Sequence, residues 1–172
     1  WKFDEGMGTT AGDSSGGGNT GTLVNGPMWT TGQAGTALNF DGVNDYVQVT
    51  NEANFDFEKT NAFSACGWIK LKTVTPSSQS IVTKMAAFAS PSPGWEFNAY
   101  NPSGGSDRLQ VYLMNAWPSN MISVYTTSVL NANNLYHACF TYDGSGSAAG
   151  VKIYRDGVLQ AVVADTNNLS AS

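Results

Sequence analysis

The sequence predicts an all-β protein of the sandwich or barrel class. Many short segments alternate apolar and polar residues with period two, turn residues recur between them at close spacing, and no window shows sustained helical periodicity. The dipeptide Asp156-Gly157 lies between two such segments and predicts a two-residue hairpin, because a type I′ turn needs positive φ at both central positions.

Residues 1–39 are rich in Gly, Thr, Ser and Asn, but apolar residues recur from Trp1 to Leu38. This spacing favours an ordered, loop-rich lead-in to the β fold over a disordered tail. The strands expected after it are ALNFDG (37–42), DYVQVT (45–50), FSACGWIKL (63–71), SIVTKM (80–85), WEFNAY (95–100), RLQVYLM (108–114), MISVYT (121–126), LYHACFTY (135–142), VKIYR (151–155) and VLQAVV (158–163).

The composition of the chain argues against several classes of function. The chain has 172 residues, of which 12% are charged, about half the usual share. The net charge is −5 and no cluster of Lys and Arg occurs, which argues against binding to nucleic acid or to anionic membranes. No apolar run approaches the roughly 20 residues of a membrane span. A polar, charge-poor surface is typical of secreted proteins and adhesins, so we expect an extracellular or cell-surface location.

The two cysteines lie in predicted strands. In the strand 135–142, Cys139 and His137 share the more polar face, and Cys66 lies on the more polar face of its own strand. If the two strands are neighbours, the cysteines can form a disulfide that closes a loop of roughly 70 residues, which stabilises by about 4 kcal/mol on the chain-entropy treatment. Two buried thiols are the alternative. A thiol activated by His137 lacks a third residue to orient the imidazole, and a zinc site needs more ligands.

The first 49 residues carry a series of motifs in a specific order. These are W-x-F-D-E-G, D-x-S-G-x-G-N-x-G-T-L, G-x-A-L-x-F-D-G and D-Y-V. Together with FSACGWIKL and LYHACFTYDG, they resemble the concanavalin A-like laminin-G domains of bacterial surface proteins, which are related to the pentraxins. The resemblance covers nearly the whole chain. It implies a two-sheet antiparallel jelly roll, and the pentraxin disulfide supports a Cys66–Cys139 bridge.

One departure from the family concerns the C-terminal part of the domain. Domains of this kind continue after the Asp-Gly hairpin with further strands, whereas this sequence ends at NNLSAS. We therefore expect residues 1–172 to form a single laminin-G-like domain that lacks its last C-terminal strands. The rest of a longer parent chain, or another chain, would then supply them, since an open sheet edge favours aggregation.

The resemblance implies recognition of a glycan or glycoprotein. Sugars stack their apolar faces on exposed aromatic rings, and polar side chains bind the hydroxyl groups. Alternation turns part of the middle strands away from the core, whereas Trp95 is expected to lie inside it. The candidate carbohydrate-binding residues are Asn98, Tyr100, Arg108, Tyr112 and, in a loop before a proline, Trp117.

The family also implies a structural or bridging Ca²⁺ ion. Asp41, Asn44 and Asp45 in FDGVND (40–45) supply the hard oxygen ligands that calcium prefers. The alternative is a turn that uses Asp and Gly for backbone reasons alone. The paired Asp-Asn that ligates calcium in pentraxins has no match here.

The sequence favours a non-catalytic binding module over an enzyme. Glycosidases of this fold carry E-x-D-x-x-E on one strand, and that pattern does not occur; the nearest carboxylates, Asp56 and Glu58, lie in a loop-like stretch. We expect carbohydrate recognition in adhesion. The alternative is a structural or protein-binding spacer of a surface fibre or pilus, and a glycoside hydrolase is less favoured.

Overall fold

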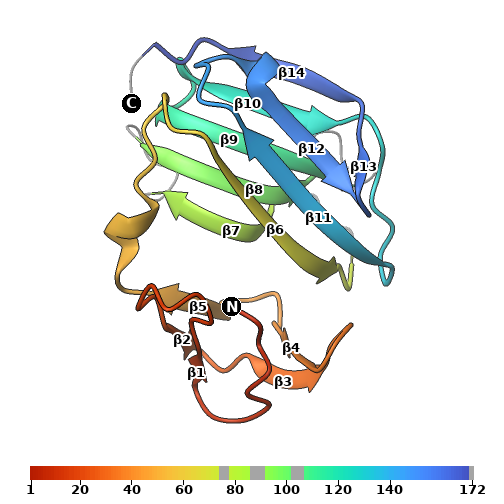
Figure 1. The fold of residues 1–172 in the computed structure, drawn as a ribbon. Coiled ribbons are helices and arrows are strands. Elements are labelled where there is room, and N and C mark those ends of the chain that lie inside the picture. The colour runs from red at the N-terminus through yellow and green to blue at the C-terminus, as the bar shows by residue number, and fades with distance from the viewer. Residues whose placement is uncertain (74–77, 86–91, 102–106, 171–172) are drawn as a thin grey trace. The chain divides into compact units, whose positions relative to one another are not determined.

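Strands and two short 3-10 helices form the regular structure of this protein in the computed structural model, which describes residues 1–73, 78–85, 92–101 and 107–170. No α-helix occurs in these ranges, which confirms the all-β prediction. The chain divides into two units, Trp1–Phe55 and Asp56–Ser172, coloured red to orange and yellow to blue in Figure 1.

The Trp1–Phe55 unit contains short strands. A three-stranded sheet has the order β1-β2-β5, and β3 pairs with β4 in a hairpin. The sequence predicted β4 and β5 but missed the first three strands, because two to four residues between glycines are too few to show alternation. The bounds are β1 Thr10–Ala11, β2 Gly21–Val24, β3 Met28–Thr31, β4 Thr36–Asn39, β5 Tyr46–Val49 and η1 Glu52–Phe55.

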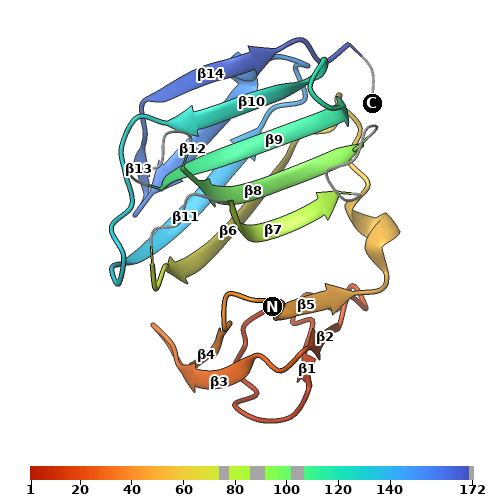
Figure 2. The same cartoon turned by 180° about the vertical axis from the view of Figure 1, so that it is seen from behind.

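The Asp56–Ser172 unit is a sandwich of two antiparallel sheets. One has five strands in the order β14-β10-β9-β8-β7 and the other has four in the order β13-β12-β11-β6. Figures 1 and 2 show the two sheets as separate layers seen from opposite sides. The bounds are β6 Phe63–Lys70, β7 Gln79–Met85, β8 Gly94–Tyr100, β9 Arg108–Ala116, β10 Asn120–Thr126, β11 Leu135–Tyr142, η2 Ala148–Gly150, β12 Val151–Arg155, β13 Val158–Leu159 and β14 Val162–Asn167.

Side chains from both sheets fill the space between the layers. Phe97 on β8 and Phe140 on β11 are fully buried, and their ring centroids lie 5.2 Å apart. Trp95 is 5% exposed and packs on Phe63, which confirms its predicted place in the core. Burial of an aromatic or aliphatic side chain of this size contributes roughly 1.5–3 kcal/mol, so this layer supplies most of the stability of the sandwich.

A disulfide joins the two cysteines, as the sequence favoured. Cys66 on β6 lies directly opposite Cys139 on β11 in antiparallel register, and their Cα atoms are 4.1 Å apart. Neither cysteine is a free thiol, so the alternative of two buried thiols is wrong, and the reactive and metal-binding roles that the sequence argued against are excluded as well.

The predicted hairpin is also present. Asp156 and Gly157 have φ values of 53° and 78°, as a type I′ turn requires. The expected strand 158–163 is wrong in extent, because the chain leaves the four-stranded sheet after β13 and joins the five-stranded sheet as β14. The break falls at Gln160, whose backbone N–H still bonds to the Ile153 carbonyl, while the Ala161 carbonyl already accepts from Thr127. An apolar run cannot reveal such a change of sheet.

Replacement of both cysteines, Cys66→Ala with Cys139→Ala, should lower the free energy of unfolding by about 4 kcal/mol, because the bridge links residues 73 positions apart and restricts the unfolded chain. Urea unfolding measures this. Ser64→Ala with Thr141→Ala, at paired positions of the same strands, is the control and should change it by about 0.5 kcal/mol at most. A loss of about 1 kcal/mol or less in the cysteine variant would contradict the expectation.

Phe140→Ala should destabilise the sandwich by about 3–5 kcal/mol, since it removes a fully buried ring and leaves a cavity between the sheets. Val158→Ala, at a position 63% exposed, should change the free energy of unfolding by about 0.5 kcal/mol at most. Calorimetry of both variants provides the test, and equal losses would show that the core lies elsewhere.

Candidate functional site

The outer face of the five-stranded sheet gathers the side chains that the sequence turned away from the core. Strands β8 and β9 pair so that Tyr100 lies opposite Arg108 and Asn98 lies opposite Gln110. Two positions further along, Tyr112 lies on the same face, because side chains alternate along a strand. The register therefore brings together four of the five predicted carbohydrate-binding residues.

Two of these four residues are less exposed to solvent than the sequence predicted. Asn98 is 0% and Tyr112 7% exposed, while Tyr100 and Arg108 are half-buried. The prediction that Asn98 and Tyr112 face solvent is therefore wrong. Alternation assigns a side chain to one face of a sheet, but exposure also depends on what packs over that face, which no local pattern encodes.

Four polar side chains on this face are almost completely buried. We call Glu96, Asn98, Gln110 and Ser123 the polar row; each is at most 1% exposed. Within the row, the Gln110 Nε2 donates to Ser123 Oγ at 3.1 Å. The sequence analysis did not single out Glu96 or Gln110, since only their burial makes them unusual.

Several atoms of the polar row are left unsatisfied. Among the described residues, Glu96 Oε2, both amide atoms of Asn98 and Gln110 Oε1 are buried without a hydrogen-bond partner. The other Glu96 oxygen accepts from the hydroxyl of Ser80 on β7. A buried polar group without a partner costs about 1–3 kcal/mol, so the unsatisfied atoms of the row lower the stability of the folded chain.

An exposed aromatic ring lies beside the row. Trp117 follows β9, has a cis peptide bond to Pro118 and is 43% exposed. Its ring meets that of Tyr112 edge to face, with centroids 6.2 Å apart. Burial, together with the nearby Tyr100, raises the pKa of Tyr112 to about 12, so its hydroxyl is protonated and neutral at ordinary pH.

The Arg108 guanidinium makes its contacts within the protein. Its Nη1 donates to the backbone carbonyls of Thr126 and Thr127, at 3.2 and 2.8 Å. Its guanidinium also lies 5.9 Å from the ring centroid of Tyr125. These contacts tie the start of β9 to the end of β10.

The predicted calcium ligands lie in the Trp1–Phe55 unit, and their carboxylates hold a turn. Asp41 Oδ1 accepts from the backbone N–H groups of Val43 and Asn44, and Asp45 Oδ2 accepts from that of Asp41 at 2.9 Å. The Asn44 carbonyl accepts from the Asn25 side chain. This is the geometry of the turn alternative, and calcium binding by Asp41, Asn44 and Asp45 stays a prediction.

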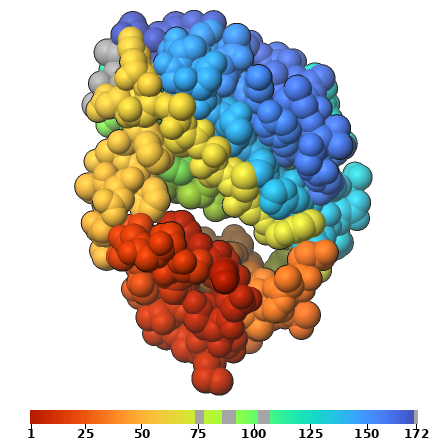
Figure 3. All heavy atoms as spheres, in the orientation of Figure 1, coloured from red at the N-terminus to blue at the C-terminus, as the bar shows by residue number. Residues whose placement is uncertain are grey.

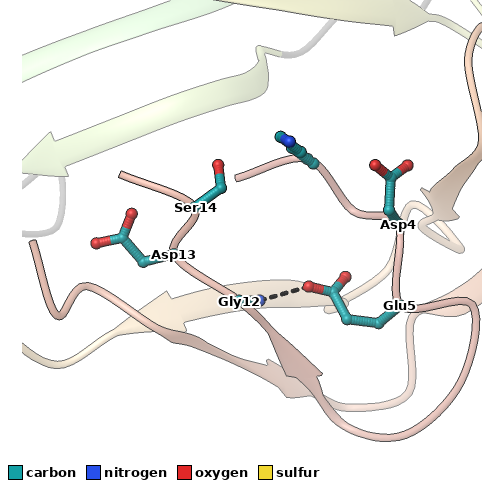
Figure 4. Close-up of a pocket in the computed structure, with 6 residues that line it drawn as sticks. Asp4, Glu5, Gly12, Asp13 and Ser14 are labelled. Carbon is teal, nitrogen blue, oxygen red and sulfur yellow. Dashed lines mark hydrogen bonds between the residues drawn. The ribbon is translucent and has the colours of Figure 1, made fainter. Parts of the chain in front are cut away.

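The same unit has a hollow of about 350 Å³, lined in part by Asp4, Glu5 and Asp13 (Figure 4). Two of these carboxylates, those of Glu5 and Asp13, accept hydrogen bonds from the surrounding loop. Glu5 Oε1 accepts from the backbone N–H of Gly12 at 2.7 Å. The hydroxyl of Ser15 and the backbone N–H groups of Asn19 and Ser15 lower the pKa of Asp13 to about 2. Among the residues described, no group of three or more His, Cys, Asp or Glu is arranged to hold a metal ion.

Comparison with known proteins gives one match. The family model Laminin_G_3, described as the Concanavalin A-like lectin/glucanases superfamily, matches residues 41–172. No curated protein and no solved structure matches the chain significantly. Within the described residues, no helix is long and apolar enough to cross a membrane.

The raised pKa of Tyr112 predicts a loss of stability in alkali. Its folded-state value of about 12 lies above the ordinary 10.0, so its contribution is fully present below pH 10 and is lost as the pH rises through 12. The free energy of unfolding should fall over this range, and Tyr112→Phe should make the fall smaller. Denaturant unfolding at several pH values tests this; an unchanged fall in the variant would contradict it.

Proposed function

Since the chain belongs to the concanavalin A-like lectin/glucanases superfamily, we propose that it is a non-catalytic module that recognises carbohydrate with the outer face of its five-stranded sheet. The observation that carries this assignment is the exposed indole of Trp117, which meets Tyr112 edge to face at this side of the sheet. The polar row lies beneath the surface, because each of its members is at most 1% exposed.

Trp117 supplies the exposed aromatic surface that sugar recognition needs. An exposed indole offers a flat apolar surface to the CH groups of a pyranose ring, and its edge-to-face contact with Tyr112 fixes its orientation. Tyr100, half-buried on the same face, extends the aromatic surface along β8. The Glu96 carboxyl at this face disfavours acidic ligands, so the site suits neutral sugars.

The absence of a catalytic motif supports binding without hydrolysis. Glycosidases use two carboxylates about 5–10 Å apart, one on each side of the scissile bond. Glu96 is the one acidic member of the polar row, and one of its oxygens bonds to Ser80. The sequence also lacks E-x-D-x-x-E.

The disulfide supports an extracellular or cell-surface setting, because such bonds persist in oxidising compartments. The partner is then a glycan or a glycoprotein, and the role is adhesion. Calcium held by Asp41, Asn44 and Asp45 belongs to this proposal, and the experiment below includes an arm for it.

A glycan array probed in calcium and then in EDTA identifies the neutral ligand, and calorimetry measures its affinity. Trp117→Ala should weaken binding about ten-fold, which corresponds to about 1.4 kcal/mol. Trp68→Ala, which removes an exposed indole from the other sheet, is the matched control and should leave the affinity unchanged.

Loss of binding in EDTA would assign the calcium a direct role, and Asp41→Asn with Asp45→Asn should then reproduce it. Binding that survives EDTA leaves the sheet face as the complete site. Absence of binding to any glycan, or equal affinity in wild type and Trp117→Ala, would refute the proposed site.

A further inference from the structure

The outer face of the four-stranded sheet carries an exposed indole that the proposed function does not use. Trp68 on β6 is 54% exposed, and β6, β11 and β12 form the face of this unit turned toward the viewer in Figure 3. Exposed apolar residues are common singly, so an isolated Trp68 would require no explanation. Its neighbours show that it is not isolated.

An apolar surface surrounds Trp68 in register across all four strands. Trp68 lies opposite His137, with ring centroids 5.1 Å apart. Two positions along β6 and β11, the disulfide lies on the same face, followed across the sheet by Tyr154 on β12 and Leu159 on β13. We call Trp68, His137, the Cys66–Cys139 disulfide, Tyr154 and Leu159 the Trp68 platform.

The platform is held in place before any ligand binds. The disulfide fixes β6 against β11 beside the indole, and the Asp156 carboxylate accepts the backbone N–H of His137 at 2.8 Å. Ordering of flexible side chains is a main cost of binding, and a rigid surface avoids it. Because Cys66 and Trp68 point to the same side of β6, the rigid disulfide and the flat indole lie together on this face.

One cation lies next to the indole on the same face. Lys70 is exposed, two positions along β6 from Trp68 and opposite Leu135. Lys152 lies at the other end of this face, where it pairs with Thr141 across from Ser64, four positions along β6 from Trp68. Of the two lysines on this face, Lys70 is therefore the nearer to Trp68, and the Asp156 carboxylate, held at the His137 backbone N–H, is an anionic group beside the platform.

The small size of the Trp68 platform favours a sugar over a protein as its ligand. A stable protein partner buries about 800 Å² on each side, usually around several large anchors. Here one indole is flanked by a histidine, a half-buried tyrosine and one leucine, which matches one or two sugar rings better than a protein surface.

We propose that the Trp68 platform is a second glycan-binding surface, specific for acidic sugars, in which a pyranose ring stacks on Trp68 and its carboxylate or sulfate group pairs with Lys70. It lies on the opposite sheet from Trp117 and the polar row, and it stands whether or not those residues bind neutral glycans. Together the two faces would let one module bridge two different polysaccharides.

Calorimetry with three oligosaccharides tests this: an oligogalacturonate for carboxylate, a heparin-derived oligosaccharide for sulfate, and maltoheptaose as the neutral probe. Wild type should bind one or both acidic probes, and Trp68→Ala should weaken that binding at least about ten-fold. Lys70→Gln should weaken it several-fold and reduce its dependence on salt. Trp117→Ala and Lys152→Gln are the controls and should leave it unchanged.

Trp68→Phe, which keeps an aromatic ring, should retain part of the affinity, and far-UV circular dichroism should show that every variant is folded. Three results would overturn the proposal: no binding of either acidic probe, unchanged affinity in Trp68→Ala, or equal losses in Lys70→Gln and Lys152→Gln, which would mark diffuse charge attraction. Failure of Trp117→Ala to affect neutral glycans would refute only the proposed function, since the acidic probes report on the other sheet.

Discussion

The contact between Phe97 of β8 and Phe140 of β11 joins the two sheets, and both candidate surfaces depend on it. Each residue points inward from its strand, so its immediate neighbours point outward. Burial of Phe97 thus turns Glu96 and Asn98 to the outer face of one sheet, and burial of Phe140 turns Cys139 to the outer face of the other. The hydrophobic layer that stabilises the sandwich therefore also determines which side chains a ligand meets.

The two outer faces differ in chemistry. The five-stranded sheet carries buried polar groups with unsatisfied atoms and an exposed indole at one end, Trp117. The four-stranded sheet carries an exposed indole beside a disulfide and a lysine, Lys70. An exposed indole offers a stacking surface for a neutral sugar ring, whereas an ammonium next to an exposed ring attracts an acidic ligand. The two proposed surfaces share no residue, so each can be tested separately.

Much of the fold could be predicted because its determinants are local. Alternation identified most strands of the Asp56–Ser172 unit, and it put Trp95 in the core, where the structure has it. The Asp156-Gly157 turn needed only the conformational freedom of two residues. The sites were less predictable: Tyr100 and Arg108 were placed on one face correctly, but Asn98 and Tyr112 are buried, and alternation does not encode how much of a face is covered.

By itself, the sequence determined that the chain is all-β, which side chains face inward, and that Cys66 and Cys139 lie on equivalent faces of their strands, since each of these follows from period-two alternation. Only the tertiary structure decided which strands are neighbours. The order of the strands lets the two cysteines bond and puts β13 and β14 in different sheets. The tertiary structure also decided that Glu96 and Gln110 are buried with atoms left unsatisfied. These features depend on strand order and on contacts between the sheets, and residues far apart in the chain create both.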